Sequence, residues 1–471
     1  PMIVIAGAGS GKTRVLTYKI AYLMTKGIDP FNILALTFTN KAAREMKDRI
    51  AMIVGDEAKN LWMGTFHSVF AKILRIEAEK LGYTSNFTIY DTEDSQKLVS
   101  SIIKELNLDK EIYKYKSIFA RISSLKNSLI TPKVYRQNVD LIESDEIAKR
   151  TSFIGIYVEY INRCFKAGAM DFDDLLLKTN ELLSKFPEVL AKYQNLYRYI
   201  LVDEYQDTNH SQYLIVKALS DKFQNICVVG DDAQSIYSFR GANIRNILNF
   251  QNDYHDVKVF RLEQNYRSTK NIVNAANSVI EKNENKLDKV VWTENEIGSK
   301  INVTRLLTDG EEGRYVASSI FESKMRNQYK NKDFVILYRT NAQSRAFEDS
   351  LRKKNIPYRV YGGLSFYQRK EIKDIIAYLR LVVNKSDEEA FKRIINFPVR
   401  GIGQTSVDKL IVESKKRGVP IFDVAKNIKD FNVGIGSKIR SKISDFILSI
   451  EKVKLMLDES NAFEITEEVI K

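Results

Sequence analysis

Two residues with phosphate-binding chemistry stand side by side near the start of the chain. Lys12 and Thr13 close the stretch IAGAGSGKT. A lysine after a Gly-rich turn can reach the β- and γ-phosphates of a nucleotide, and the next hydroxyl can bind Mg²⁺. The turn whose backbone N–H groups would cradle the phosphates consists of Gly7, Ala8, Gly9, Ser10 and Gly11. The stretch predicts a nucleotide-binding loop, although Ala6 stands where such loops usually begin with glycine.

An acidic pair later in the chain indicates which reaction the loop would serve. In YILVDEYQDTN, an apolar run leads directly to Asp203 and Glu204. Asp203 at the end of a buried strand can hold Mg²⁺, directly or through water, and Glu204 can deprotonate a water that attacks the γ-phosphate. A base aimed at water favours hydrolysis over transfer to an acceptor, which argues against a nucleotide kinase. The structural alternative is an acidic pair that caps a helix, and the phosphate loop disfavours it.

Short apolar runs rich in Val and Ile would position these residues. The runs are Met2–Gly7, Ile33–Phe38, Tyr199–Glu204, Ile226–Asp231 and Val257–Leu262. Helical patterns, such as Thr13–Met24 and Lys41–Ile53, lie between several of them. Alternating buried strands and helices predict an α/β fold with a parallel sheet, in which ligands gather at the carboxyl ends of the strands.

The stretch VVGDDAQSIYSFRGA, which begins in one of these runs, combines two kinds of chemistry. Gln234 lies close enough to the expected strand end to reach the γ-phosphate or the attacking water. A few residues later, Tyr237, Phe239 and Arg240 can face nucleic acid, because aromatic rings stack on bases and arginine contacts phosphate. The alternative is that these aromatic residues belong to the core, which would be the default for a lone aromatic.

The overall charge agrees with a polyanionic partner. The 471 residues hold 73 Lys and Arg against 60 Asp and Glu, a formal net charge of +13. This excess favours nucleic acid, with a solvated basic surface as the alternative. The apolar runs are too short and too interrupted to cross a membrane. Cys164 and Cys227 lack metal-site spacing and fit a reducing compartment, so we expect a cytoplasmic protein.

Ordered stretches along nearly the whole chain resemble the superfamily 1A DNA helicases of the UvrD/PcrA/Rep group. Besides AGAGSGKT and DEYQDTN, the matching stretches are ALTFTNKAAREMKDRI, GTFHSVF, MDFDDLL, VVGDDAQSIYSFRGA, LEQNYRST, ILYRTNAQSRAFE and GGLSFYQRKEIKD. So many motifs in one order exclude coincidence. The compact inserts favour this group over RecB- or AddA-like helicase–nucleases, which would require a nuclease domain.

The resemblance implies two RecA-like P-loop domains with parallel sheets, the second incomplete, each with a mainly helical insert. The sequence pattern agrees, because the chain becomes mostly helical after about Thr84 and strands are expected to return at Ile301–Leu307 and Phe334–Arg339. The expected domains are 1A at 1–83 and 186–267, insert 1B at 84–185, domain 2A at 268–361 and insert 2B at 362–471.

The resemblance also implies ATP hydrolysis with Mg²⁺ that drives 3′→5′ movement along single-stranded DNA and separates duplex at junctions. The sequence does not choose between DNA repair, replication restart and recombination control. By resemblance, Tyr266 stacks on adenine, Arg267 is an arginine finger for the γ-phosphate, and Arg14 belongs to the nucleotide site. A finger offered across a cleft makes hydrolysis depend on closure, which converts chemistry into motion.

Further residues are expected to contact DNA by resemblance. The expected floor for the bases and backbone comprises Phe38, Thr65, Phe66, His67 and Phe172. Phe38 would pocket a base and Phe172 is the weaker stacking candidate, whereas His67 on its own chemistry would more often be a structural residue. Many relatives carry Trp at the place of Phe239, so its smaller ring is expected to stack less strongly.

Two other features have ordinary structural alternatives. Asp171, Asp173 and Asp174 could be mistaken for a nuclease metal cluster, and we interpret them as structural residues that cap a helix. Gly401 and Gly403 form a GIG turn, and a second GIG follows in FNVGIGSKIRSKI. One such turn is usually a simple helix break, but two with basic followers favour helix–hairpin–helix contacts to duplex backbone.

Several stretches typical of the group are not found in this sequence. They are the helix before the phosphate loop, whose Gln reads adenine, and the later motifs V and VI. We therefore expect a fragment, with repair or replication proteins bound through segments absent here. Two alternatives stay open, namely an active DNA helicase and a fragment that binds DNA and nucleotide without turnover.

Overall fold

The largest element of the structure is a six-stranded sheet in which every pairing is parallel, in the order β3-β2-β6-β7-β1-β8. This computed structural model describes residues 1–471 apart from 284–286, 288, 363–365, 432 and 471 and the side chain of residue 240. The strands are β1 (Met2–Ala6), β2 (Ile33–Thr37), β3 (Trp62–Thr65), β6 (Tyr199–Val202), β7 (Ile226–Gly230) and β8 (Lys258–Leu262). The predicted α/β class is confirmed, as are the five strands predicted before residue 268, and β3 is an additional strand of this sheet.

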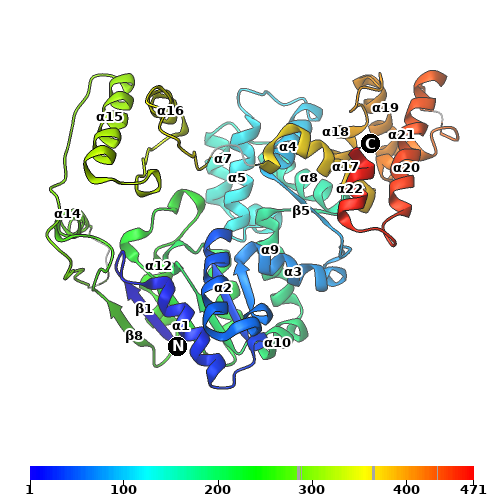
Figure 1. Ribbon diagram of the computed structural model, residues 1–471. Coiled ribbons are helices and arrows are strands. Elements are labelled where there is room, and N and C mark those ends of the chain that lie inside the picture. Colours follow the sequence, from blue (N-terminus) through cyan, green and yellow to red (C-terminus); the bar gives the residue numbers. More distant parts are fainter. Residues whose placement is uncertain (284–286, 288, 363–365, 432, 471) are drawn as a thin grey trace.

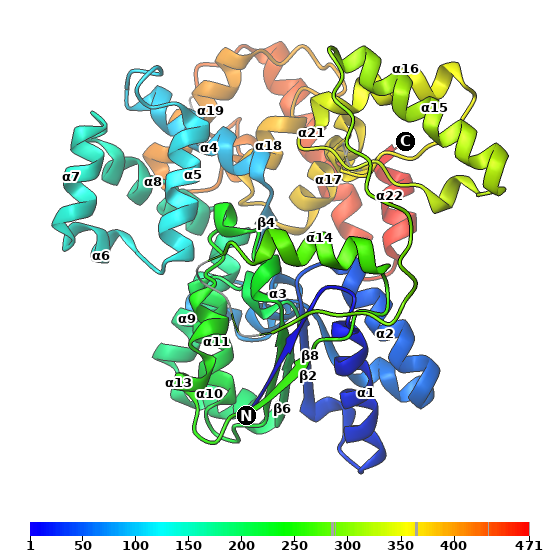
Figure 2. The same cartoon turned by 90° about the vertical axis from the view of Figure 1, so that its left-hand side faces the viewer.

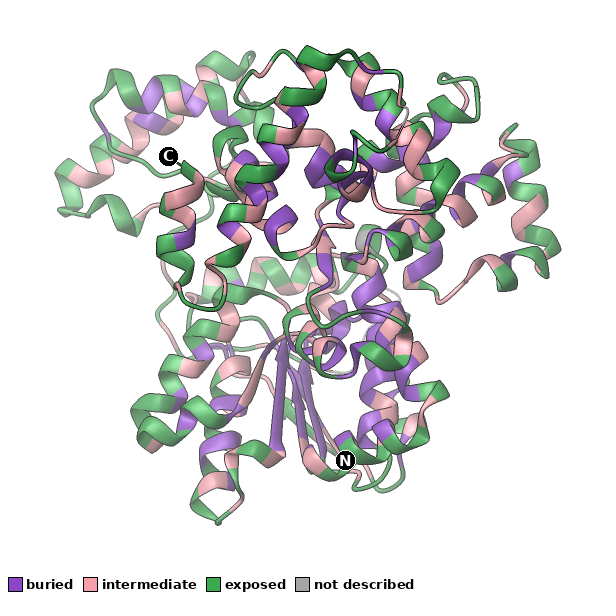
Figure 3. Ribbon diagram, turned by 90° about the vertical axis from the view of Figure 1, so that its right-hand side faces the viewer, coloured by how far each residue is buried: buried purple, intermediate pink, exposed green. Residues whose placement is uncertain are grey.

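Helices cover the sheet on both faces (Figure 3). Ile3 and Ile5 of β1 point into one hydrophobic cluster, and Val4 and Ala6 point into another, as the two-residue period of a strand requires. The helices connected with this sheet are α1 (Lys12–Thr25), α2 (Asn40–Val54), α3 (Phe66–Ile76), α9 (Phe172–Lys185), α10 (Pro187–Leu196), α11 (His210–Ser220), α12 (Arg245–Leu248) and α13 (Phe250–Asp253). Burial on both faces explains why β1, β2, β6 and β7 read as continuous apolar runs, whereas β8 at the sheet edge is largely exposed.

A separate group of helices stands above the sheet in Figure 1, with a short parallel strand pair at its base. The pair is β4 (Thr88–Tyr90) with β5 (Ala169–Asp171), and the helices are α4 (Thr92–Glu105), α5 (Tyr115–Asn127), α6 (Pro132–Arg136), α7 (Val139–Ile147) and α8 (Phe153–Lys166). These helices share a hydrophobic core of their own. The predicted change to mostly helical structure after Thr84 is therefore observed, with β4 and β5 as exceptions.

The region after α14 (Lys270–Ile280) differs from the prediction. The sequence predicts strands at Ile301–Leu307 and Phe334–Arg339, but neither segment pairs as a strand among the described residues. Val303 is 94% exposed and Leu337 is 86% exposed. A strand needs a neighbour that shares its backbone hydrogen bonds, and the described part of the chain places none beside these segments. Instead, α15 (Asp309–Asn327) packs against α16 (Ser344–Lys353) as a helical pair.

Short 3₁₀ turns connect many of these elements. They are η1 (Pro30–Asn32), η2 (Gly55–Asn60), η3 (Ala78–Leu81), η4 (Tyr205–Asp207), η5 (Asp232–Gln234), η6 (Ser238–Arg240), η7 (Asn331–Asp333), η8 (Asn341–Gln343) and η9 (Phe366–Gln368). Among the helices that the structure describes, none combines the length and apolarity that a membrane span requires.

The last helices form a cluster with its own core that docks on the helices of residues 92–166 (Figures 1 and 2). They are α17 (Lys370–Val383), α18 (Glu388–Ile394), α19 (Gln404–Arg417), α20 (Ile421–Lys426), α21 (Ser437–Leu455) and α22 (Ala462–Ile470). Arg380 joins the two clusters, because it donates to Asp94 of α4 at 2.6 Å and to Asp387 at 2.9 Å. Asn384 Nδ2 also donates to the carbonyl of Ala167 at 2.9 Å.

Replacing Arg380 by Met tests how firmly the two helical clusters are joined. The substitution keeps an apolar stem but leaves the buried carboxylates of Asp94 and Asp387 without their cation, which costs about 3–5 kcal/mol. We expect a lower Tm and faster amide hydrogen exchange in α4 and α17. Lys426→Met, which removes an exposed pair with Glu451, is the matched control and should leave both nearly unchanged. Unchanged exchange in α4 of R380M would contradict this account.

Candidate active site and nucleic-acid interface

The phosphate loop has the backbone geometry that its glycines predict. β1 ends and α1 begins with five residues between them. Gly9 and Gly11 have φ values of 70° and 96°, a region that glycine adopts without strain. A Cβ at Gly9 would lie 2.8 Å from the side chain of Asn265. Ser10 Oγ donates to the carbonyl of Gly7 at 2.7 Å, so the loop is held in a shape that directs the start of α1 outward, as anion binding requires.

A cavity of about 350 Å³ opens beside this loop. Its lining consists of Gly9, Gly11, Lys12, Thr13, Arg14, Ala42, Glu45, Arg49, Glu204, Gln234 and Arg267. The structure therefore brings together predicted residues from four separate stretches of the chain. Tyr266 is 68% exposed and stands outside this lining. Glu45 and Arg49 were not predicted, although both stand in the quoted stretch ALTFTNKAAREMKDRI and are four residues apart on α2.

Opposite charges meet inside the cavity. Lys12 Nζ lies 3.5 Å from Glu204 Oε2 and 4.0 Å from Asp231 Oδ2. Among the described residues, no atom accepts a hydrogen bond from this ammonium group, although it is buried. Lys12 is thus held by charge alone, and its N–H groups stay available for an oxygen-rich ligand.

The acidic pair after β6 combines a buried carboxylate at Asp203 with a strained backbone at the half-buried Glu204. Asp203 is 3% exposed, and burial, together with the charge of Glu204, raises the pKa of Asp203 to about 7. Glu204 has φ 49° and ψ 45°, a left-handed conformation that costs free energy for a residue with a side chain. This turn directs the carboxylate of Glu204 toward Lys12, so the strain serves the geometry of the site.

Two buried amide side chains tie the loops together, and neither was predicted. Gln206 Nε2 donates to Glu204 Oε2 at 2.9 Å, and its Oε1 accepts from the backbone N–H of the residue after β7 at 3.0 Å. Asn265 Nδ2 donates to the carbonyl of Ala8 at 2.7 Å, and its Oδ1 accepts from the backbone N–H of Arg267 at 2.8 Å. Both residues stand in the quoted motifs, but residue type alone does not reveal that an amide links two loops.

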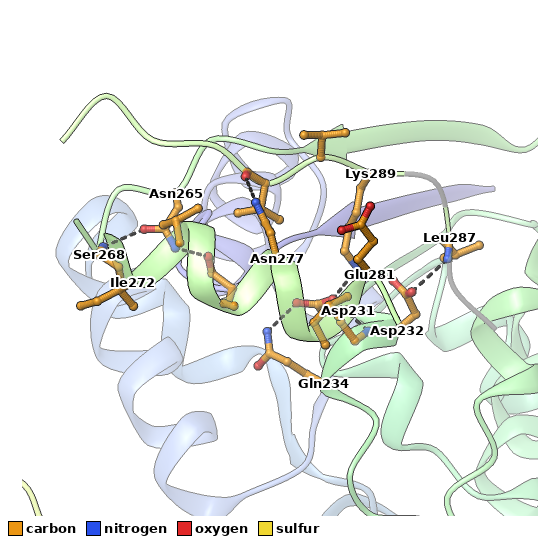
Figure 4. Close-up of a pocket in the computed structure, with 17 residues that line it drawn as sticks. Asp231, Asp232, Gln234, Asn265, Ser268, Ile272, Asn277, Glu281, Leu287 and Lys289 are labelled. Atoms are coloured by element: carbon orange, nitrogen blue, oxygen red, sulfur yellow. Dashed lines mark hydrogen bonds and ion pairs between the residues drawn. The ribbon is translucent and has the colours of Figure 1, made fainter. Parts of the chain in front are cut away.

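Gln234 lies where the sequence predicts, at the carboxyl end of β7. Its Nε2 donates to Asp231 Oδ2 at 2.6 Å. The residue lines both the 350 Å³ cavity and a second cavity of about 470 Å³, drawn in Figure 4. A rotation of its side chain would therefore exchange a contact inside the protein for one with a ligand.

Aromatic rings gather at the same edge of the sheet. Phe38 stacks on Tyr237 with ring centroids 5.3 Å apart, and Tyr237 lies 6.0 Å from Phe239. A second pair joins His67 and Phe172 at 5.9 Å. Phe239 and Phe172 are 71% and 50% exposed. Exposed rings that lie beside half-buried rings form a surface on which bases can stack.

Among the predicted DNA-contact residues, the structure contradicts one, gives local contacts or burial for two others, and does not describe the side chain of a fourth. Phe66 is 1% exposed within the main hydrophobic cluster, so the prediction that its ring faces DNA is wrong: it follows β3 on the inward side of α3. Thr65 caps the same helix through its Oγ1, which accepts from the N–H of Ser68 at 3.3 Å. Burial lowers the pKa of His67. The side chain of Arg240 lies outside the described residues.

The three aspartates near Phe172 are structural, as predicted. Asp171 and Asp174 form a capping box at the start of α9. Lys126, which is fully buried, lies 2.7 Å from Asp171 and 2.8 Å from Asp174. Asp173 accepts from Asn127 Nδ2 at 2.8 Å. No group of three or more metal-ligating side chains exists in the described part of the chain.

The two GIG turns contact each other's helices. Gly401 and Gly434 have φ values of 70° and 65°, and each turn leads into a helix, α19 or α21. Lys442 of α21 donates to the carbonyl of Arg400 at 2.7 Å, and Lys409 of α19 donates to the carbonyl of Gly434 at 2.6 Å. Gly403 is the exposed N-cap of α19. The pair thus forms one unit with two exposed helix starts.

Asp203→Asn tests the cost of the buried acid. A carboxyl group whose pKa is raised in the folded state gives stability that is complete below about pH 4 and is lost as the pH rises to about 7. Asparagine has no such loss, so we expect D203N to raise the Tm by several degrees at pH 8, measured with EDTA present, and by less at pH 5. Asp56→Asn, at an exposed position, is the control. A constant Tm difference across this pH range would contradict the prediction.

Comparison with known proteins agrees with this geometry. Residues 1–255 match the family described as UvrD/REP helicase N-terminal domain, and residues 260–454 match the UvrD-like helicase C-terminal domain. The ATP-dependent DNA helicase PcrA of Bacillus subtilis (strain 168) is 46% identical over 475 residues, which cover 100% of this chain and 63% of that protein.

Other relatives give the same result. PcrA of Staphylococcus epidermidis (strain RP62A) is 45% identical and PcrA of Staphylococcus aureus (strain Mu50) is 44% identical, each over 468 residues. These alignments cover 99% of this chain and 63% and 62% of the two relatives. The chain therefore spans less than two thirds of the length of these relatives. Because both family matches together cover most of the chain and lie in the order of the motifs, this chain belongs to the UvrD/Rep family of helicases.

Proposed function

We propose that this chain carries the motor of an ATP-dependent DNA helicase that moves 3′→5′ along single-stranded DNA. The observation that carries the proposal is the 350 Å³ cavity, in which Lys12, Glu204 and Arg267 face one space. The aromatic rings at the same sheet edge supply a neighbouring surface for bases. The relatives are named ATP-dependent DNA helicases, which supports the same activity for this chain.

In this proposal each loop has one task. The backbone N–H groups of residues 7–11 and the ammonium of Lys12 bind the phosphates of ATP. Glu204 takes a proton from the attacking water, and Gln234 orients that water. Arg267 offers its guanidinium to the charge that develops on the γ-phosphate. Tyr266 stacks on the adenine, and Arg14 completes the nucleotide site.

Mg²⁺ fits the oxygen donors at this place. The hydroxyl of Thr13 and the carboxylate of Asp203 are the ligands that the proposal assigns, and Mg²⁺ commonly binds through one or two protein oxygens together with phosphates and water. When bound, the ion neutralises charge on the phosphate oxygens. Asp203 needs its charged form to take part, so protonation below about pH 7 competes with the ion.

The DNA surface is proposed to run from the sheet edge to the last helices. Bases stack on Phe38, Tyr237, Phe239 and Phe172, while Thr65, His67 and Arg240 contact the backbone. The helix starts at Gly401 and Gly403 are proposed to bind duplex backbone beside a junction. Sequence preference should be slight because stacking and phosphate contacts carry little sequence information. We also propose that the protein works in repair, replication restart or recombination control. Its proposed location is the cytoplasm, on the nucleoid, and its proposed partners are repair or replication proteins.

The first test is steady-state ATP hydrolysis by this chain with and without single-stranded DNA. We expect Mg²⁺-dependent hydrolysis that DNA stimulates, and a fall of 10²-fold or more, roughly the size of one charge contact to a reacting phosphate, in Lys12→Ala. Arg352→Ala, at an exposed site, is the matched control. DNA binding without hydrolysis would favour a binding fragment, and hydrolysis that K12A leaves unchanged would refute the assigned site.

Phe239 gives a test of the DNA surface. Phe239→Ala removes an exposed ring, and stacking on one base is worth about 1–3 kcal/mol, so the Kd for oligo(dT) should rise about 5- to 150-fold. Phe239→Trp enlarges the ring and should tighten binding. Fluorescence anisotropy at fixed salt measures both. Phe463→Ala, 70% exposed on α22, is the control, and an equal loss in that variant would argue against a stacking role for Phe239.

A further inference from the structure

Lys289 contacts two buried carboxylates beside the nucleotide cavity. Its side chain is 7% exposed, and its Nζ lies 2.5 Å from Asp231 Oδ1 and also contacts Asp232 Oδ1. Both aspartate side chains are 1% exposed. Adjacent buried carboxylates repel each other and lose their hydration, and a cation that contacts both offsets this cost.

The backbone around Lys289 is fixed to the same wall. The N–H of Leu287 donates to Asp232 Oδ2 at 2.9 Å, and the N–H of Val290 donates to Glu263 Oε1 at 3.0 Å. A surface lysine that folded inward by chance would lack such anchors on both sides. Lys289 also lies in the part of the chain that matches the C-terminal family domain, whereas both aspartates lie in the part that matches the N-terminal one.

Asp231 stands between two lysines, and Asp232 does not. Asp231 Oδ2 lies 4.0 Å from Lys12 Nζ, and Lys289 donates to Asp231 Oδ1. The same Oδ2 accepts from Gln234 Nε2 (Figure 4). Within the described residues, Lys12 pairs with Glu204 and Asp231 only. Asp231 is therefore the carboxylate for which Lys12 and Lys289 compete.

We propose that Lys289 is a positioning residue of the nucleotide site, which compensates Asp231 and so keeps this carboxylate from binding Lys12. Lys12 then keeps its N–H groups for the phosphates. Because Asp231 also holds Gln234, the same contact fixes the amide that faces the cavity. The inference rests on the proposed function, since it concerns the same site, and adds a residue that no motif contains.

The test compares the affinity of variants for ATPγS with Mg²⁺ by isothermal titration calorimetry. In Lys289→Met, Asp231 turns to Lys12, and the affinity should fall about tenfold or more, as expected for a charge contact of about 4 Å in a partly buried site. Lys289→Arg should retain the affinity. Asp231→Asn added to K289M should restore the affinity, because it removes the competing charge.

The matched comparison is Asp232→Asn added to K289M. Both double variants remove one lysine and one of the two buried charges, but only the first removes the carboxylate next to Lys12. The comparison does not depend on whether K289M alone folds, because both double variants carry the same number of buried charges. Restoration by D231N and not by D232N supports the proposal.

Two results would overturn this inference and leave the proposed function standing. One is equal ATPγS affinities of the two double variants, and the other is an affinity of K289M equal to that of the unsubstituted chain. Either result would assign Lys289 a purely structural role. Failure of the unsubstituted chain to bind ATPγS would overturn the proposed function, and this inference with it. The two failures are therefore distinguishable in one series of titrations.

Discussion

Charge balance at the carboxyl edge of the sheet is the constraint on which the nucleotide cavity depends. Parallel strands end at one edge, so β6 and β7 deliver four carboxylates there, at Asp203, Glu204, Asp231 and Asp232. A polyphosphate adds more negative charge to the same place. Phosphate groups can bind at this edge only if its cations are not already paired with the carboxylates. Lys12, held by charge without a hydrogen bond to a described residue, meets that condition.

Hydrogen bonds between loops give this edge its rigidity. Gln206 joins the loop after β6 to the loop after β7, and Asn265 joins the phosphate loop to the segment that carries Arg267. Each amide satisfies backbone groups on one loop and reaches another, so neither loop shifts without breaking a buried bond. A preorganised site of this kind spends little free energy on ordering its side chains when a ligand binds.

The sequence predicts most of the sheet and the chemistry of its loops, because both follow from local patterns. Continuous apolar runs predict the strands, and the Gly-rich or acidic residues at the ends of those runs predict the nucleotide site. What it misses depends on long-range placement. Phe66 stands next to His67 but on the inward face of α3. Ile301–Leu307 has residues that favour a strand, yet a strand also needs a partner. Lys289 lies in no motif, and only the fold shows that it reaches Asp231.

The loop after β7 joins the two proposed activities over a very short distance. Gln234 faces the nucleotide cavity, and Tyr237, three residues later, stacks on Phe38 in the aromatic surface. Between them, Ser235 Oγ donates to the carbonyl of Gln206 at 3.3 Å, so the loop is attached to the turn that follows β6 and the acidic pair of Asp203 and Glu204. If Gln234 exchanges its bond with Asp231 for one with a ligand in the cavity, the change occurs three residues from Tyr237, within one anchored loop. Under the proposed function, coupling between ATP and DNA needs no long relay, because this one loop contributes Gln234 to the cavity and Tyr237 to the aromatic surface.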